Sequence, residues 1–281
     1  MSYGSTEAVR GIDLDVNRGE VFAFLGPNGA GKTTTVEILE GYRRRTGGEV
    51  TVLGEDPERA GRDWRERIGI VLQGGRLDPY LTVCESLDLY AGYFRSPRPT
   101  EDVIALIGLE DKADERASRL SGGLQRRLDV GMALVGDPEL LFLDEPTTGF
   151  DPSARRQAWD VIAGLRALGK TVFLTTHYMD EAQRLADRVT IIAAGQIVAR
   201  GTPADLGNRA GGETTIRYRA GGREVSLQTN EPVKALNELT GRALADGEEL
   251  EGLEVTRPSL EDVYLELTAA AEASAAQEVT E

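Results

Sequence analysis

The sequence is short of the residues that build disulfides and zinc sites, with one cysteine, Cys84, and one histidine, His177, among 281 residues. A lone cysteine has no partner within the chain, and together with one histidine it cannot supply the four ligands of a structural zinc ion. Basic residues are also few: 32 lysines and arginines face 47 acidic residues, which gives a formal net charge of −15. This balance argues against a generally basic nucleic-acid-binding protein, so we expect no nucleic-acid partner.

Long apolar runs are missing as well. The most apolar segments, such as 21–26 and 140–143, end after a few residues, whereas a membrane span requires about 18 or more. The first ten residues also lack the apolar core of a signal peptide. We therefore expect a soluble, cytoplasmic protein that reaches a membrane only through a partner. A chain of this length can bury a core without disulfides or structural metal.

Short, nearly continuous apolar runs recur along the first two thirds of the chain, and helical patterns separate them. This alternation is typical of a mostly parallel α/β sheet. The runs lie at residues 19–26, 68–72, 140–144, 172–176 and 189–193. From about residue 74 to 135 the chain shows helical periodicity before the run at 140–144, which predicts a helical insert there.

The C-terminal part of the chain differs in charge and pattern. Residues 201–281 carry 7 basic and 16 acidic groups, a net charge of −9, which leaves −6 for the first 200 residues. A predicted hairpin at 214–229, a helix at 233–241 and a strand at 253–256 indicate a small α+β domain, to which we assign residues 207–268. Its last helix places Leu260, Val263, Tyr264 and Leu267 on one face. We expect residues 269–281 to be a disordered tail.

A glycine-rich motif stands between the first apolar run and a helical pattern. Residues 26–33 match GxxxxGK[ST], in which successive backbone amides face inward as an anion nest at a helix N-terminus. The lysine adds a positive charge for phosphates, and the hydroxyl that follows it can bind Mg²⁺. The alternative, a glycine-rich turn with a solvated lysine, fits poorly with a strand before and a helix after. The predicted phosphate-binding residues are Asn28, Gly29, Ala30, Gly31, Lys32, Thr33 and Thr34.

An acidic pair ends the apolar run at 140–144. The strand carries Asp144 to the carboxyl edge of the sheet, where ligands bind in such folds. We expect Asp144 to help hold Mg²⁺ together with Thr33, and Glu145 to polarise an attacking water. On its own the pair could be an ordinary strand-to-turn feature, but beside a phosphate-binding loop it indicates hydrolysis.

A third motif, Ser121-Gly122-Gly123 within the segment LSGGLQ, opens a helical stretch. A serine hydroxyl and two glycine amides at a helix N-terminus form another anion site. The segment resembles the signature sequence of ABC-type ATPases, although Leu124 stands where glutamine is usual. The resemblance implies a P-loop ATPase fold with an antiparallel β-subdomain and a helical subdomain, here followed by the small α+β domain. It also implies a head-to-tail homodimer in which the signature of one subunit closes over the ATP of the other.

The remaining family positions are matched in order along the chain. The resemblance implies that Gln73 joins the Mg²⁺ shell and senses the transport partner, and that Asp151 crosses the dimer interface. It further implies that His177 contacts the γ-phosphate and that Tyr3 stacks on adenine. Seen alone, each would be read as an ordinary loop or packing residue. Relatives have a further strand before this tyrosine, where only Met1 and Ser2 stand here, so we expect either a longer native start or an unpaired sheet edge.

The resemblance covers residues 3–206 through specific motifs and continues less specifically to residue 268. The ending RPSLEDVYLELT is similar to ATP-binding subunits of bacterial drug exporters of the daunorubicin-resistance type. It implies a Mg²⁺-dependent ATPase at the cytoplasmic face of the cell membrane, bound to a separate permease that exports a drug, lipid or other small molecule. The alternative is a non-transport ABC ATPase acting on ribosomes or DNA. A P-loop kinase or GTPase and a non-hydrolysing nucleotide binder fit the motifs less well.

Overall fold

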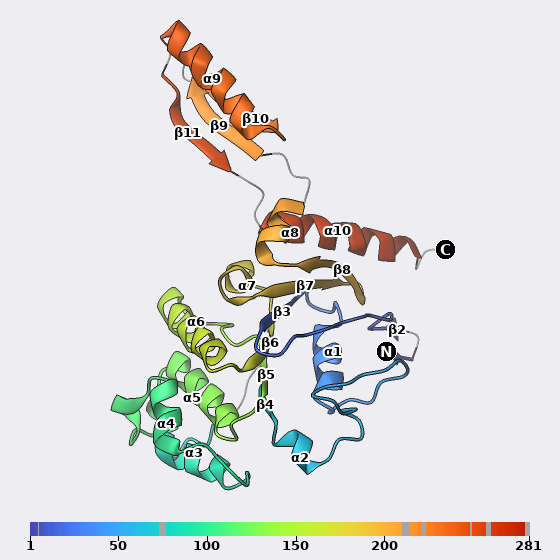
Figure 1. The fold of residues 1–281 in the computed structure, drawn as a ribbon, viewed down its shortest axis with the longest axis vertical. Coiled ribbons are helices and arrows are strands. Elements are labelled where there is room, and N and C mark those ends of the chain that lie inside the picture. The colour runs from blue at the N-terminus through green and yellow to red at the C-terminus, as the bar shows by residue number, and fades with distance from the viewer. Residues whose placement is uncertain are drawn as a thin grey trace.

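A mixed six-stranded sheet forms the centre of the molecule (Figure 1). The computed structural model describes residues 1–4, 6–72, 77–209, 214–220, 223–247, 249–256 and 260–278. The strand order is β4-β5-β6-β3-β7-β8, and only the edge strand β8 runs antiparallel to its neighbour. The strands are β3 (Val21–Leu25), β4 (Ile68–Val71), β5 (Leu140–Asp144), β6 (Thr171–Thr176), β7 (Arg188–Ala193) and β8 (Gln196–Gly201). The predicted parallel α/β sheet is confirmed.

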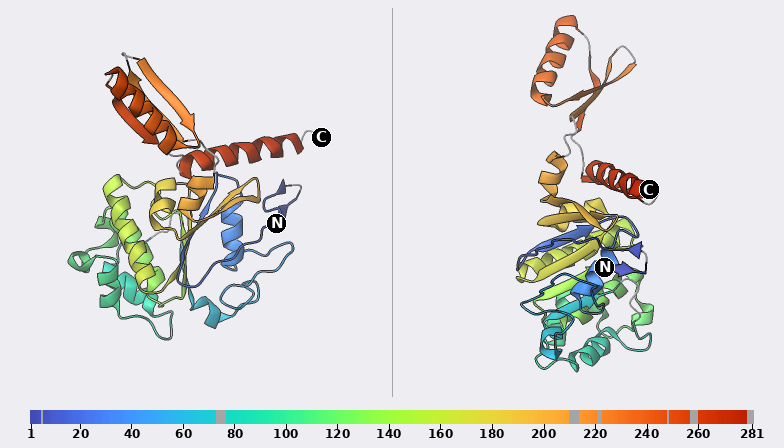
Figure 2. Two further views of the ribbon diagram at one scale, coloured as in Figure 1. Left: turned by 45° about the horizontal axis from the view of Figure 1, so that its top comes forward. Right: turned by 90° about the vertical axis from the view of Figure 1, so that its right-hand side faces the viewer.

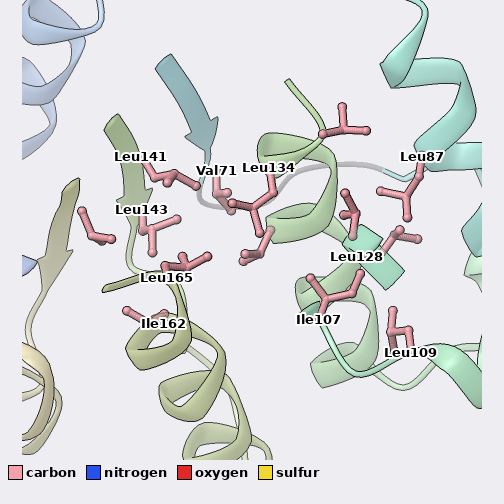
Figure 3. Packing of buried hydrophobic residues seen from close by; sticks show 14 of the residues in the cluster. Val71, Leu87, Ile107, Leu109, Leu128, Leu134, Leu141, Leu143, Ile162 and Leu165 are labelled. Atoms are coloured by element: carbon pink, nitrogen blue, oxygen red, sulfur yellow. The ribbon is translucent and has the colours of Figure 1, made fainter. Parts of the chain in front are cut away.

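The strands are apolar because helices or loops cover both faces of the sheet. On one face, the rings of Phe22, Phe24 and Phe142 pack around Phe173, with centroids 5.3 to 5.7 Å apart. On the other, side chains of β4 and β5 meet those of the helices α5 and α6 (Figure 3). Parallel strands place their carboxyl ends at one edge, so the segments that follow β3, β5 and β6 converge there.

Helices connect the strands. The helices α1 (Lys32–Leu39), α6 (Pro152–Ala167) and α7 (Met179–Leu185) follow β3, β5 and β6, and the short α2 (Arg62–Arg65) precedes β4. The predicted helical insert contains α3 (Val83–Ala91), α4 (Thr100–Leu106), the 3-10 turns η1 (Glu110–Lys112) and η2 (Ala117–Arg119), and α5 (Gly122–Leu134). No helix in the described ranges is both long and apolar enough to cross a bilayer.

The antiparallel part near the N-terminus is small. Within the described residues it consists of the two-residue strands β1 (Ser2–Tyr3) and β2 (Thr6–Glu7) and a single bridge between Val52 and Glu55. The segment 10–17 alternates half-buried and exposed residues as a strand would. Its apolar residues pack on the core, but the segment joins none of the described ladders.

A small unit of three strands and a helix follows residues 1–209, which build the main sheet and which we call the cassette. It contains β9 (Thr214–Ala220), β10 (Arg223–Thr229), α9 (Pro232–Asp246) and β11 (Glu251–Thr256), with strand order β10-β9-β11. The predicted hairpin is confirmed, because β9 and β10 pair antiparallel around residues 221–222. Figures 1 and 2 show this unit on the far side of α8 and α10 from the main sheet.

Two helices correct the predicted domain boundary. The helices α8 (Pro203–Arg209) and α10 (Leu260–Glu278) pack against β7, β8 and α7 rather than belonging to the small unit. Leu260 is 2% exposed and shares a core with Leu25, Ile191 and Leu206. The apolar face of the last helix is therefore buried against the cassette, and the proposed domain at 207–268 is too long at both ends. The predicted disordered tail is also wrong for residues 269–278, which continue α10 because this alanine-rich segment favours helix.

Candidate functional site

A cavity of about 670 Å³ opens at the carboxyl edge of the sheet. It brings together the loop after β3 and the residues that follow β5 and β6. Most of its lining was predicted from sequence; Ala8 and Thr148 were not. The lining residues are Ala8, Asn28, Gly29, Gly31, Lys32, Thr33, Thr34, Asp144, Glu145, Thr148 and His177.

Two glycines of the loop stand where no side chain fits. A Cβ on Gly26 would lie 2.4 Å from the carbonyl oxygen of Ile192. Gly31 has a φ of 103°, and a Cβ there would lie 2.5 Å from the carbonyl oxygen of Ala8. The loop can therefore pass close to its neighbours and lead directly into the N-terminus of α1, an arrangement that suits phosphate binding.

Lys32 is buried at the start of α1, and its ammonium is held by its own loop. Nζ donates to the carbonyl oxygens of Gly26, at 2.6 Å, and Pro27, at 3.0 Å. Burial lowers the pKa of Lys32, while the carboxylates of Glu145 and Asp144 act in the opposite direction. The lysine thus presents a positive charge in a cavity whose other charged residues are acidic.

Thr175 of β6 positions both acidic residues. It lies opposite Asp144 in the ladder, and its hydroxyl donates to Oδ1 of Asp144. The backbone N–H of Glu145 lies 3.1 Å from both the carbonyl oxygen and the hydroxyl of Thr175. Glu145 has a φ of 44°, a left-handed conformation that is unfavourable for glutamate. Strain of this kind is typical of functional positions, where the surrounding contacts enforce it.

The side chain of Glu145 is held from two sides. Its Oε1 lies 3.2 Å from Nδ1 of His177, and its Oε2 accepts a hydrogen bond of 3.0 Å from the hydroxyl of Thr148. Only 10% of the glutamate side chain is exposed, against 38% for His177. The two oxygens therefore have a fixed orientation at the wall of the cavity.

The residues present suit a magnesium ion. Thr33 and Asp144 line the same cavity and offer a hydroxyl and a carboxylate, the oxygen ligands that Mg²⁺ prefers. The site therefore fits the ion that the sequence predicted. Gln73, the third predicted ligand, lies outside the described residues. So does the side chain of Tyr3, whose backbone belongs to β1.

The signature residues and Asp151 lie together elsewhere. Ser121 is the N-cap of α5, and a Cβ on Gly123 would lie 3.0 Å from Cβ of Ala154 on α6. Asp151 caps α6 by accepting hydrogen bonds from the backbone N–H groups of Ser153, at 2.8 Å, and Ala154, at 2.9 Å. None of Ser121, Gly122, Gly123 and Asp151, all within the described part, lines the cavity that contains Lys32.

Arg126 was not predicted from sequence. This residue of α5 donates to the carbonyl oxygens of Leu72 (2.5 Å), Asp144 (2.8 Å) and Pro146 (3.3 Å), and it pairs with Asp129 at 3.7 Å. Burial lowers the pKa of Arg126 and raises that of Asp129. The guanidinium therefore fastens the signature helix to the ends of β4 and β5. Sequence reasoning could not find it, because a charged residue in a helix is ordinarily solvated.

Comparisons with known proteins agree with this geometry. A family model described as ABC transporter matches residues 9–148. The Nod factor export ATP-binding protein I of Rhizobium meliloti (strain 1021) is 41% identical over 95% of this chain and 85% of its own. The daunorubicin resistance ATP-binding protein DrrA2 of Streptomyces coeruleorubidus is 38% identical over 95% of this chain and 90% of its own.

Solved structures show the same fold. A dimeric ATP-binding cassette in a post-hydrolysis state, bound to ADP and Pi, matches with a TM-score of 0.63 and 25% identity, over 72% of this chain and 94% of its own. An ATP-binding subunit of an ABC transporter matches with a TM-score of 0.65 and 26% identity, over 74% of this chain and 89% of its own. The predicted fold and the predicted ATPase activity are confirmed. The chain belongs to the ABC transporter family and is an ATP-hydrolysing, ATP-binding subunit of the export type.

Proposed function

We propose that this chain hydrolyses ATP as a head-to-tail homodimer and so drives export through a separate membrane permease. One observation supports the proposal of a dimer. Lys32, Glu145 and His177 line one cavity, whereas the described residues Ser121–Gly123 lie outside it. A signature that contacts the same ATP must then come from a second copy. The dimeric cassette among the similar structures supports this arrangement.

ATP would bind through the backbone amides of residues 28–34 and the ammonium of Lys32, which exchanges loop carbonyls for phosphate oxygens. Thr33 and Asp144 would hold Mg²⁺, with Gln73 as a proposed further ligand. When bound, Mg²⁺ neutralises charge that develops on the phosphate oxygens. Tyr3 is proposed to stack on adenine.

Glu145 is the proposed group that activates water. A carboxylate with both oxygens in fixed hydrogen-bonding positions can orient a water molecule and take up its proton. His177 lies against that carboxylate and would contact the γ-phosphate, so it aligns the glutamate with the phosphate that is attacked. Asp151 is proposed to cross the dimer interface beside the signature.

The permease would place this subunit at the cytoplasmic face of the cell membrane. Two similar proteins are named for Nod factor export and for daunorubicin resistance. We propose a drug, lipid or other small molecule as cargo, chosen by contacts within the permease. We propose no nucleic-acid partner, in keeping with the net charge of −15.

A mixing experiment tests the shared site. Homodimers of Lys32→Ala and of Ser121→Arg each lack an intact site, whereas a mixed dimer has one. Random one-to-one mixing makes about half of the dimers mixed, so roughly a quarter of all sites should be restored. ATPase activity, measured with the permease and with subunit exchange confirmed by tags, should exceed that of either variant. An activity equal to the average of the two parents would contradict the composite site.

A further inference from the structure

Glu181 is a buried carboxyl that neither the phosphate site nor the signature uses. It lies in α7, four residues beyond His177, and its exposed fraction is 0%. Its Oε1 accepts two hydrogen bonds, from the hydroxyl of Thr147 at 2.8 Å and from Nε1 of Trp159 at 3.0 Å. One oxygen atom therefore joins three segments that are far apart in the sequence.

Each of these segments carries a residue with a proposed role in hydrolysis or at the dimer interface. Thr147 stands two residues after Glu145, next to Thr148, which donates to that glutamate. Trp159 belongs to α6, which Asp151 caps. Glu181 itself lies on the helix that follows His177. The positions of Glu145, His177 and the start of α6 are thus set relative to one another around Glu181.

Contacts nearer the surface join α6 to the segment 177–180, which links β6 to α7. The guanidinium of Arg155 lies 4.1 Å from the ring centroid of Tyr178 and 3.4 Å from Oδ2 of Asp180. The ring of Tyr178 in turn contacts that of His177, at 4.1 Å between centroids. The buried pair formed by Trp159 and Glu181 is therefore the inner part of a wider contact between α6 and the segment that bears the histidine.

This arrangement is unfavourable for stability alone. Burial raises the pKa of Glu181, and the hydrogen bonds that its carboxyl accepts only oppose the shift. Oε2 is buried, and no hydrogen bond of regular geometry reaches it within the described residues. Burying a polar atom that makes no hydrogen bond costs free energy. An apolar residue would fill the same space without that penalty, but it could not accept hydrogen bonds from both neighbours.

We propose that Glu181 is a positioning residue for ATP hydrolysis: by holding Thr147 and Trp159 on one oxygen, it keeps Glu145 and His177 aligned. The inference rests on the proposed roles of those two residues. Misplacing reacting groups by about 1 Å can slow catalysis by about 100-fold. Glu181 touches none of the residues that bind phosphate, so its effect should fall on kcat.

Three variants test the role of the carboxyl. Glu181→Ala should lower kcat by about 10- to 100-fold, with the KM for ATP within about threefold of wild type. Glu181→Gln should recover most of the rate, because the amide oxygen can accept the same two hydrogen bonds. Gln183→Ala, a change at an exposed position of the same helix, is the control and should leave kcat within about twofold. ATPase assays with the permease and direct ATP binding give both parameters.

Two further variants remove the donors and leave the carboxyl in place, which keeps the test open if Glu181→Ala does not fold. Thr147→Val and Trp159→Phe should each lower kcat by about 2- to 10-fold. Combining either with Glu181→Ala should add no further loss, because the interaction is already gone.

Three outcomes would overturn the inference: a folded Glu181→Ala variant with wild-type kcat, a Gln variant no better than Ala, or Thr147→Val and Trp159→Phe variants that both match wild type. The failure of the proposed function would look different. In that case Glu145→Gln itself would hydrolyse ATP normally.

Discussion

Oε1 of Glu145 and Nδ1 of His177 lie 3.2 Å apart, although the two residues follow different strands of the sheet. The contact exists because β5 and β6 are neighbours whose carboxyl ends are level, with Asp144 opposite Thr175. A carboxylate and an imidazole in this relation can share the work of holding a water molecule and a phosphate oxygen.

Removing the carboxylate of Glu145 should separate binding from hydrolysis. Glu145→Gln preserves size and hydrogen bonding, so ATP should still bind while turnover falls by about 10²- to 10⁴-fold. The ATP-bound dimer should then persist and be visible by light scattering. A variant that stays monomeric with ATP and turns over normally would exclude Glu145 as the catalytic group.

The ammonium of Lys32 is expected to matter for nucleotide rather than for folding. Lys32→Ala should lower ATP affinity or turnover by about tenfold or more, because a charge-assisted contact to phosphate is lost. The matched control is Lys112→Ala. Lys112 is another of the four lysines in the chain and lies in the 3-10 turn η1, so this variant should bind ATP as wild type does. Equal affinity of the two variants, measured by titration with ATP, would contradict the assignment.

Glu40 should make stability depend on pH. It is buried at the end of α1, and its carboxylate oxygens have no hydrogen-bond partner among the described residues. Burial above all, with the charges of Asp144 and Glu37, raises its pKa from 4.5 to about 8. Between these values the folded protein keeps a proton that the unfolded chain has lost. The free energy of unfolding therefore falls as pH rises through this window.

Substituting Glu40→Gln should remove that dependence. The variant should exceed wild type in unfolding free energy by on the order of 4 kcal/mol near pH 8, and by little near pH 4.5. Urea denaturation at both pH values measures the difference. If the stability of the variant varies with pH as that of wild type does, Glu40 is not the responsible group.

The attachment of α10 can be measured with two leucines of the same helix. Leu260 is 2% exposed and packs in the core with Leu206, whereas Leu265 is 57% exposed. Leu260→Ala should lower the free energy of unfolding by about 2–5 kcal/mol, and Leu265→Ala by no more than about 0.5 kcal/mol. Equal effects in thermal or urea unfolding would mean that α10 is not anchored through Leu260.

The main sheet and the phosphate-binding loop could be predicted because their signals are local. A run such as VFAFL followed by GPNGAGKT specifies a strand, a turn that only glycine permits and a helix start within one short segment. Asp144 and Glu145 could be predicted from their place at the end of an apolar run, and His177 from the family resemblance, and parallel pairing then brings them to one edge.

The features that sequence could not supply depend on tertiary contacts. The amphipathic pattern of α10 shows that one face is buried, but it does not say against which element, and so the domain boundary was placed wrongly. Arg126 and Glu181 are charged residues in helices, which ordinarily face solvent. Only the fold shows that carbonyl oxygens surround the first and that a threonine and a tryptophan bind the second.

The small unit of β9, β10, α9 and β11 is an insertion fixed at two points rather than an appendage hanging from one. The chain leaves the cassette at α8 and returns at α10, and these helices contact each other on the β7 and β8 side of the sheet. A unit that is tied to the rest of the fold by two chain segments has fewer ways to move than one that is tied by a single segment. One of the two flanking helices, α10, contacts β7, and β7 adjoins β3, the strand that leads into the glycine-rich loop. The point of attachment of the small unit therefore lies one strand away from the strand that positions this loop.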